Sequence, residues 1–263
     1  MHTHPQGYVK SHTEHGITSI EFCHPKGNSL PAAILEDLAQ EIHAAGLNSD
    51  TKIIILRSFE GDILQGKATP FCGGASFDEL VAIADEKAGL KFFSGFAHVI
   101  NAMRKCPKFI IGRIHGKCVG GGVGLAAAVD YAIAVEGADV KLSELAVGIG
   151  PFVVGPAVER KIGLGGFSAL SIDATMWRNA EWARKKGLFA EVHSSAENMD
   201  EAISRLANTL SHSSTEAMAE LKKVFWQGTD HWDELLLSRA AISGRLVLSD
   251  FTRNAIEKFK AKK

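Results

Sequence analysis

The chain has almost no net charge and no long apolar run. Its 263 residues include 29 basic and 30 acidic side chains, for a formal charge of −1 at pH 7. Nucleic acids and anionic membranes bind basic surfaces, so we expect neither as a partner. No stretch approaches the ~20 apolar residues of a membrane span, and the first residues lack the apolar core of a signal peptide. We therefore expect a cytoplasmic protein.

Cysteine is scarce as well. The thiols at Cys23, Cys72, Cys106 and Cys118 form no CxxC pair. Disulfide frameworks and structural zinc sites use regularly spaced cysteines. The spacing therefore predicts reduced thiols and no metal site.

Motifs for nucleotides and for a serine nucleophile are missing. The chain has no GxxxxGK[ST] loop and no GxSxG elbow. The segment Gly163-Leu-Gly165-Gly166 lacks the third glycine of a dinucleotide fingerprint and follows a helical pattern. In Gly148-Ile-Gly150-Pro151, proline removes a backbone donor. These absences argue against a kinase or a nucleotide-dependent oxidoreductase, and we expect no cofactor.

Two glycine corners are the most informative features that are present. Gly120–Gly122 follows an apolar run at Phe109–Ile114 and opens an alanine-rich helix, and Gly73–Gly74 follows the run Ile53–Leu56. A strand that feeds glycines into a helix start gathers free backbone N–H groups and the positive end of the helix dipole. Such corners can bind phosphate or an oxyanion. They can also be ordinary turns in which glycine permits close packing.

Strand and helix patterns alternate in the first half of the chain. Apolar runs flanked by charges, such as Lys52–Arg57, are typical of buried parallel strands. A helical stripe runs from Ile34 to Ile42 after Ser29 and Pro31. The alternation predicts an α/β fold with parallel strands. The other predicted strands are Ile17–Phe22, Phe109–Ile114, Tyr131–Val135 and Val140–Ser143; the other predicted helices are Leu90–Arg104 and Gly122–Ala128, and Ser58–Ser76 is predicted to be a loop.

Helical patterns dominate after Gly155. From Asn198 onward they follow one another with little else, which predicts a helical region at residues 196–263, used in assembly, behind a core at residues 1–195. The predicted helices are Gly165–Ala174, Ala180–Lys186, Glu201–Leu210, Thr215–Trp226, Trp232–Ser243 and Asp250–Phe259, with a strand-like Leu188–His193 between them.

Glu144 is the candidate acid–base group. It lies among apolar residues at the end of a predicted strand. Burial of a carboxyl group is costly unless it is paired or functional, and it raises the pKa toward neutrality. That pKa would suit a proton shuttle. The alternative is an acid at a helix N-terminus, capped by Ser143.

The histidines are weaker candidates. His115, beside Gly116, could act as a base near the glycine corner, although a turn histidine with local hydrogen bonds is the simpler interpretation. The histidines among the first 15 residues are predicted to lie on a flexible tail.

Taken together, these segments resemble the crotonase, or enoyl-CoA hydratase/isomerase, superfamily. Five stretches are similar to that family's motifs and occur in the same order. They are His24–Leu30 (RPxxxNAL), Phe71–Phe77 (FxAGADL), Ile114–Asp130 (NGxxxGGGxELxxxxD), Leu142–Pro151 (PExxxGxxP) and Ala180–Val192 (AxEAxxxGLVxxV).

The resemblance implies a spiral of repeated ββα units with C-terminal helices that form homotrimers, often paired as hexamers. It implies an acyl-CoA thioester substrate, with coenzyme A as part of the substrate. Gly73 and Gly121 would hold the thioester oxygen, and Glu144 would move the proton. Coenzyme A would lie near Lys26 and the residues beside the two corners, namely Gly74, Ala75 and Gly120.

Departures from the motifs bear on the reaction. Hydratases of the family usually carry a second glutamate where this chain has Gly124, and Ser76 replaces the usual aspartate. Isomerisation needs one base, whereas hydration usually needs two groups. A looser likeness to methylglutaconyl-CoA hydratase-like proteins favours hydration by a small margin. Enoyl-CoA isomerisation, or a non-catalytic acyl-CoA binding role, is the alternative.

The acyl group is not specified by the sequence. Phe152, Val153 and Val154 could form an apolar wall. Arg113, Lys117 or Arg160 could pair with a substrate carboxylate, although each is predicted to be a surface charge.

Overall fold

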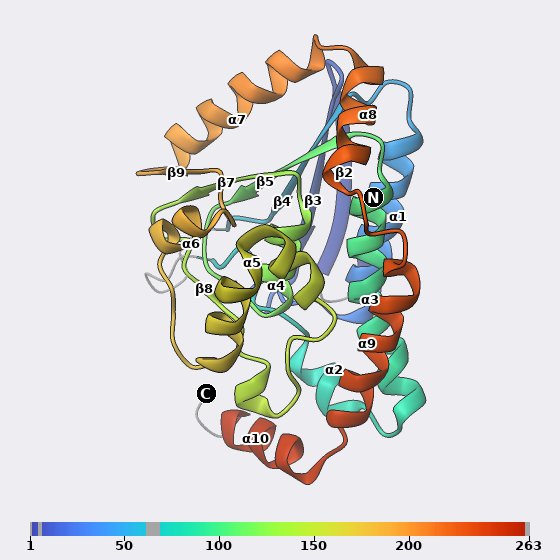
Figure 1. Ribbon diagram of the computed structural model, residues 1–263, viewed down its shortest axis with the longest axis vertical. Helices are drawn as coiled ribbons and strands as arrows, with labels where there is room; N and C mark the ends of the chain where they lie inside the picture. Colours follow the sequence, from blue (N-terminus) through green and yellow to red (C-terminus); the bar gives the residue numbers. More distant parts are fainter. Residues whose placement is uncertain (1, 5–6, 62–68, 261–263) are drawn as a thin grey trace.

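A computed structural model describes residues 2–4, 7–61 and 69–260. Its centre is a seven-stranded sheet in the order β1-β2-β3-β4-β5-β7-β9 (Figure 1). The first three strands are antiparallel neighbours, and the rest run parallel from β3 onward. The expected α/β class with parallel strands is therefore confirmed. The strands are β1 (His2–His4), β2 (Gly7–Glu14), β3 (Ile17–Cys23), β4 (Ile53–Ser58), β5 (Phe109–Ile114), β7 (Tyr131–Val135) and β9 (Glu191–His193).

Adjacent residues along the parallel strands belong to two different hydrophobic clusters. Ile54 and Ile110 belong to the larger core, which also contains the apolar faces of α1 (Ala32–Leu47) and α3 (Glu86–Lys105). Their chain neighbours Ile53 and Ile111 belong to a second cluster, with Met199 and Ile203 of α7 (Ala196–Ser211). Successive side chains of a strand point to opposite faces. A sheet covered on both faces therefore requires the continuous apolar runs that the sequence contains.

The chain winds through repeated strand–strand–helix turns. β5 leads into β6 (Cys118–Val119) and α4 (Gly121–Ala128), and β7 leads into β8 (Val140–Lys141) and α5 (Gly155–Ile172). β5 pairs in parallel with β7, and β6 pairs in parallel with β8, so the two turns stack. Single bridges from Cys72 to Cys118 and from Leu30 to Ala75 link the earlier turns to this stack. This stacking places the segments that follow the strands of successive turns next to one another.

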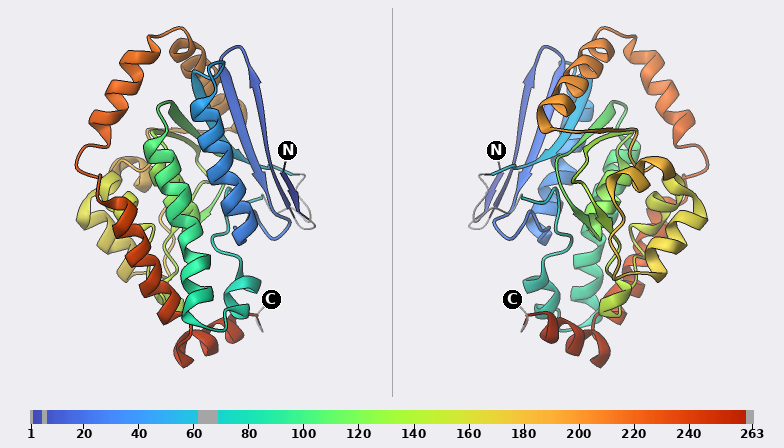
Figure 2. Two further views of the ribbon diagram at one scale, coloured as in Figure 1. Left: turned by 90° about the vertical axis from the view of Figure 1, so that its right-hand side faces the viewer. Right: turned by 90° about the vertical axis from the view of Figure 1, so that its left-hand side faces the viewer.

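The C-terminal helices pack back onto the same chain (Figures 1 and 2). α9 (Trp232–Leu246) runs along α3, where a Cβ on Gly89 would lie 2.6 Å from the Gly244 carbonyl oxygen. α8 (Thr215–Phe225) is tied to the core by Lys222, whose Nζ donates to Asp130 Oδ2 at 2.8 Å. α10 (Asp250–Lys260) contacts the short helix η2 (Leu145–Val147). None of the described helices is long and apolar enough to cross a membrane.

The N-terminal segment differs from its prediction. The histidines expected on a flexible tail lie in β1, in β2 or in the turn after it, and His12 pairs with Ser19 across β2 and β3. Val9 is fully buried, and its burial docks β2 against the core. A strand with so few inward apolar side chains has little hydrophobic pattern, which is why the sequence did not reveal it.

Two further elements also differ. The helix expected at Gly165–Ala174 is the second half of α5, which kinks at Gly163, where φ is 70°. Helix α2 (Phe77–Ala82) was not predicted; it directly follows the predicted Ser58–Ser76 loop, of which residues 62–68 lie outside the described residues. The helix predicted at Ala180–Lys186 is confirmed as α6.

Candidate active site

The first glycine corner lies where β6 ends and α4 begins. Gly120 has a φ of 51°, a left-handed conformation that favours glycine. A Cβ on Gly121 would lie 2.3 Å from Phe96 Cε1 of α3, so this position has no room for a side chain. The Gly121 amide is the first of α4 and donates no hydrogen bond to any described residue. It is therefore an unused donor at a helix N-terminus.

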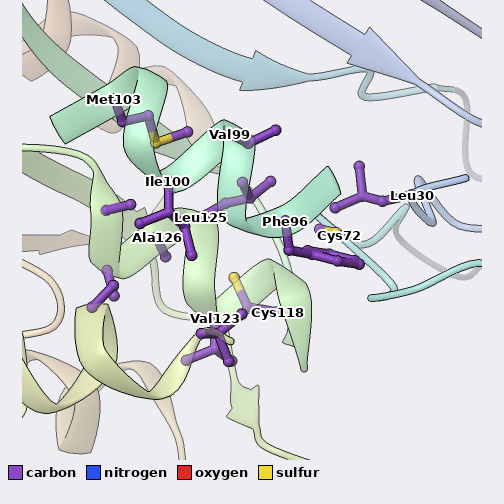
Figure 3. Close-up of a cluster of buried hydrophobic side chains, with 14 of the residues drawn as sticks. Leu30, Cys72, Phe96, Val99, Ile100, Met103, Cys118, Val123, Leu125 and Ala126 are labelled. Atoms are coloured by element: carbon purple, nitrogen blue, oxygen red, sulfur yellow. The ribbon is translucent and has the colours of Figure 1, made fainter. Parts of the chain in front are cut away.

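The second corner, residues 73–75, contacts the first. A Cβ on Gly74 would lie 2.9 Å from the Val119 carbonyl oxygen and 3.9 Å from the Gly121 nitrogen. Phe96 of α3, Cys72 and Cys118 belong to one cluster of buried hydrophobic side chains beside the corners (Figure 3). The packing therefore holds two loops that are distant in sequence within a few ångströms of each other.

Hydrogen bonds in the second corner revise the expected donor. The Gly73 N–H donates to the Gly27 carbonyl at 2.9 Å, so it is already engaged. The Leu30 N–H donates to the Gly74 carbonyl at 2.8 Å, and the Ser76 N–H donates to the Leu30 carbonyl at 3.1 Å. This parallel bridge leaves the Ala75 N–H between them without a partner among the described residues. The amides of Ala75, Gly121 and Gly122 therefore donate to no described residue, and those of Ala75 and Gly121 come one from each corner.

Asn28 holds the engaged side of this corner in place. Its φ is 51°, and its side-chain Nδ2 donates to the carbonyl oxygens of Phe59 and Pro70, each at 2.9 Å. The same loop supplies the Gly27 carbonyl that binds Gly73. Asn28 therefore has a structural role within the segment around Lys26, which was expected to lie near the ligand. The sequence shows the asparagine but not these partners.

Glu144 lies against the first corner. A Cβ on Gly120 would lie 2.9 Å from Glu144 Oε1. The Oε2 atom is buried and has no hydrogen-bond partner among the described residues. Burial raises the pKa of this carboxyl to about 7, and a hydrogen bond from its own backbone lowers it by less. Glu144 lies at the N-terminus of the short helix η2, as in the alternative interpretation, but no hydrogen bond from a Ser143 cap is present.

Two cavities adjoin at these residues. Their shared lining consists of Gly73, Ala75, Phe77, Val119, Ser143 and Val147. The inner cavity contains Glu144 and is otherwise mostly apolar. Its apolar side chains are Phe77, Leu80, Phe93, Phe96, Val119, Val147, Ile149, Pro151, Phe152, Val153 and Val154, which include the wall predicted at residues 152–154.

The outer cleft is wide, and its charged lining consists of three lysines and one aspartate. It is lined by Lys26, which forms an ion pair with Asp78, and by Lys141, Lys258 and Trp177. The Lys141 ammonium lies 4.4 Å from the centre of the Trp177 ring, and that of Lys117 lies 4.7 Å from it. Burial and the charge of Lys117 together lower the pKa of Lys141. A basic cleft with an exposed aromatic ring can hold an anionic ligand with a flat ring system.

Two other candidates lie away from both cavities. Arg113 was expected on the surface, but it is buried, with its guanidinium paired to Asp200 at 2.5 Å and to Glu60 at 2.8 Å. His115 is buried beside Phe71, and burial lowers the pKa of its imidazole to about 4. Neither side chain lines a cavity described above.

The remaining candidates have local roles. Arg160 stacks over Trp226 at 4.6 Å, away from the cleft. Ser76, found in place of an aspartate, caps α2 by accepting a hydrogen bond from the Glu79 amide. At Gly124 an added Cβ would lie 2.4 Å from Val154 Cγ1, so Val154 fills the space into which a side chain at this position would project.

Comparisons with known proteins agree with this architecture. The chain is 27% identical over 215 residues to a (7aS)-7a-methyl-1,5-dioxo-2,3,5,6,7,7a-hexahydro-1H-indene-carboxyl-CoA hydrolase of Mycobacterium tuberculosis, covering 80% of each chain. It is 22% identical to a peroxisomal Delta(3,5)-Delta(2,4)-dienoyl-CoA isomerase of Arabidopsis thaliana, covering 94% of this chain and 91% of the relative.

Solved structures and a family model extend the comparison. An enoyl-CoA hydratase from Bacillus halodurans superposes with a TM-score of 0.85 at 20% identity, covering 95% of this chain and 99% of that one. The expected crotonase-like fold is therefore confirmed. A family model described as enoyl-CoA hydratase/isomerase matches residues 12–241. On this evidence of sequence and fold, the chain belongs to the enoyl-CoA hydratase/isomerase family, the crotonase superfamily.

Proposed function

We propose that the protein transforms an acyl-CoA thioester, with Glu144 as the single acid–base group. The observation that carries this proposal is the carboxyl of Glu144, which lies beside the first glycine corner, has a pKa of about 7, and holds its buried Oε2 atom without a hydrogen-bond partner among the described residues. A general acid–base group is most effective when its pKa lies near the working pH. A structural carboxyl at this depth would be expected to have a partner.

The two cavities suit the two halves of such a substrate. The lysines of the outer cleft complement the phosphates of coenzyme A, and the inner cavity is apolar enough for an acyl chain. Gly73, Ala75 and Ser143 line both cavities, so a substrate that spans them would place its thioester near the glycine corners. Lys26, Gly74 and Gly120 remain proposed contacts of the ligand.

The two free amides define the proposed oxyanion site. Removal of a proton beside a thioester moves negative charge onto the carbonyl oxygen. We assign its stabilisation to the N–H groups of Gly121 and Ala75, with Ala75 in place of Gly73, because the Gly73 amide already has a partner. Fixed donors stabilise the charge as it develops, and the loss of one typically costs about 10²–10³ in rate.

A single carboxylate favours double-bond isomerisation. Glu144 can take a proton from one carbon of an enoyl group and return it to another, which requires no second group. Val154 fills the space at position 124, so the inner cavity offers no other carboxylate among the described residues. This observation reverses the small preference for hydration drawn from the sequence. Hydration stays the second candidate, because Ser143 lines the cavity and could position water.

The test uses two substrates and one variant. Ultraviolet absorbance of the conjugated thioester should rise with a 3-enoyl-CoA if the protein isomerises, and fall with crotonyl-CoA if it hydrates. Glu144→Gln should abolish turnover but keep acyl-CoA binding, whereas the control Glu220→Gln, at an exposed residue, should behave as wild type. Full activity in Glu144→Gln would refute the mechanism. Binding without turnover of either substrate by the wild type would instead favour the non-catalytic role.

The proposal also includes the oligomeric state of the protein. α8 exposes Leu221, Val224 and Phe225, and Val224 is 62% exposed. Burial of such a patch against another subunit would be favourable. We therefore keep the homotrimer, alone or paired as a hexamer, as the proposed state. Light scattering that shows a monomer at micromolar concentration would reject it.

A further inference from the structure

The inner cavity is almost free of ionisable side chains. Among the described residues that line it, Glu144 is the only one that can carry a charge. The other side-chain polar atoms are the hydroxyls of Ser143 and Ser243, and Ser243 reaches the cavity from α9. The aromatic rings come from two helices, α2 and α3, and from the segment before α5.

Basic groups are present nearby but are placed elsewhere. Lys26, Lys141 and Lys258 line the outer cleft and are absent from the inner lining. Arg113, considered earlier as a partner for a substrate carboxylate, is buried and paired with two acidic side chains. The described part of the inner cavity therefore holds no cation that could neutralise an anionic acyl group.

A carboxylate on the acyl chain would meet two penalties in this cavity. It would lose water with no opposite charge to replace it, and unpaired charges are expensive to bury. It would also approach the carboxyl of Glu144, and like charges in one pocket oppose each other's ionisation. A methyl or phenyl group at the same place would instead gain from contact with the apolar walls.

We propose that the acyl group of the substrate is uncharged and apolar, and that the inner cavity rejects acyl groups ending in a carboxylate. This inference rests on the proposed function, since it takes the inner cavity as the acyl site. It departs from the glutaconyl-type substrate that the looser sequence likeness would suggest. It assigns the lysines of the outer cleft to the coenzyme A portion alone.

A matched pair of ligands tests the inference by binding, without turnover. The pair is 2-pentenoyl-CoA and glutaconyl-CoA, which have the same number of acyl carbons and differ in a terminal methyl or carboxylate. Each competes with a fluorescent CoA thioester on Glu144→Gln, the variant designed to prevent turnover, so the comparison measures the desolvation penalty without repulsion from the Glu144 carboxylate. We expect 2-pentenoyl-CoA to bind at least about tenfold more tightly. Equal affinity, or tighter binding of glutaconyl-CoA, would overturn the inference and leave the proposed function standing.

The proposed function fails in a different way. If neither acyl-CoA binds more tightly than free coenzyme A, the inner cavity is not an acyl site, and both proposals are refuted. This result is readily told apart from the loss of selectivity alone.

A designed cation supplies a second test. Phe152 lines the inner cavity and is half-buried. In a Glu144→Gln background, Phe152→Arg should shift the affinity ratio toward glutaconyl-CoA by at least about tenfold, while Phe152→Leu should leave it near the parent value. Should Phe152→Arg fail to fold, Phe152→Lys places a slimmer cation at the same half-buried lining position. An unchanged ratio in a folded arginine or lysine variant would overturn the inference.

Discussion

Val154 occupies the space into which a side chain at Gly124 would project. A Cβ on Gly124 would lie 2.4 Å from Val154 Cγ1 and 2.7 Å from its Cβ, and Val154 is only 4% exposed. These distances are far inside ordinary contact. The second glutamate of the hydratase motif is therefore replaced by close packing between α4 and the residue that precedes α5.

This relationship predicts coupled stability effects. Gly124→Ala should destabilise the fold by about 1–3 kcal/mol, because overpacking outweighs the better helix propensity of alanine. Gly165→Ala, at a helical glycine with nothing within 4 Å, should be neutral or slightly stabilising. Adding Val154→Ala to the Gly124→Ala variant should restore part of the free energy of unfolding that Gly124→Ala loses. Chemical denaturation of wild type, Gly124→Ala, Val154→Ala and the double variant measures the coupling, and strictly additive losses would refute the contact.

The raised pKa of Glu144 predicts a pH dependence of stability. The folded carboxyl has a pKa of about 7, against an ordinary value of 4.5, so between these values the folded state holds a proton that the unfolded chain has released. Stability from this group is complete below pH 4.5 and falls as pH rises through 7. Relative to Glu144→Gln, wild type should lose on the order of 3 kcal/mol between pH 4 and 8.

Activity should follow the opposite trend from stability. Glu144 acts as a base only when ionised, so turnover should rise with pH up to and beyond about 7. Urea titrations and initial rates over the same pH series give both readouts. A flat stability difference between wild type and Glu144→Gln would contradict the burial of this carboxyl.

Backbone substitution separates the two amides of the second corner. Lactic acid in place of Ala75 exchanges the N–H for an ester oxygen and should lower turnover by about 10²–10³, with little change in stability. Glycolic acid in place of Gly73 removes the hydrogen bond to Gly27 and should cost about 0.5–1.5 kcal/mol of stability, with a smaller effect on turnover. The reverse pattern would restore Gly73 as the donor.

The buried ion pair between α8 and the core makes a prediction for stability. Asp130 accepts hydrogen bonds from Lys222 Nζ at 2.8 Å and from Trp226 Nε1 at 3.3 Å. Asp130→Ala would leave the lysine charge buried without its partner, which should cost about 3–5 kcal/mol. Glu220→Ala, which breaks an exposed pair with Lys223, should cost less than about 1 kcal/mol. Thermal unfolding compares them, and equal losses would contradict the structural role of Asp130.

Much of the architecture could be predicted from sequence because its signals are local. The run Lys52–Arg57 identified β4 to within a residue at each end, and the glycines at Gly120–Gly122 marked the start of α4. Sequence also singled out Glu144, whose apolar neighbours suggested the burial that the structure shows. Strand β2 escaped prediction because few of its residues are apolar and buried, so its sequence has little hydrophobic pattern.

Local sequence could not predict which amide of the second corner is the free donor. Gly73 and Ala75 are two residues apart, and either amide could face a ligand as far as the sequence is concerned. The Gly27 carbonyl, brought in by the loop around Asn28, takes the Gly73 amide and leaves that of Ala75 free. The burial of Arg113 could not be predicted from local sequence either, because it depends on Asp200, which lies on α7.

The sequence by itself determined the family, the α/β alternation, the glycine corners and the single carboxyl at Glu144, because periodicity, glycine and motif order act over short stretches of chain. Only the tertiary structure decided which amides are free, what fills the space at Gly124, and where the cations lie. Those outcomes depend on contacts between segments far apart in the chain, and such contacts arise only when the turns of the fold stack.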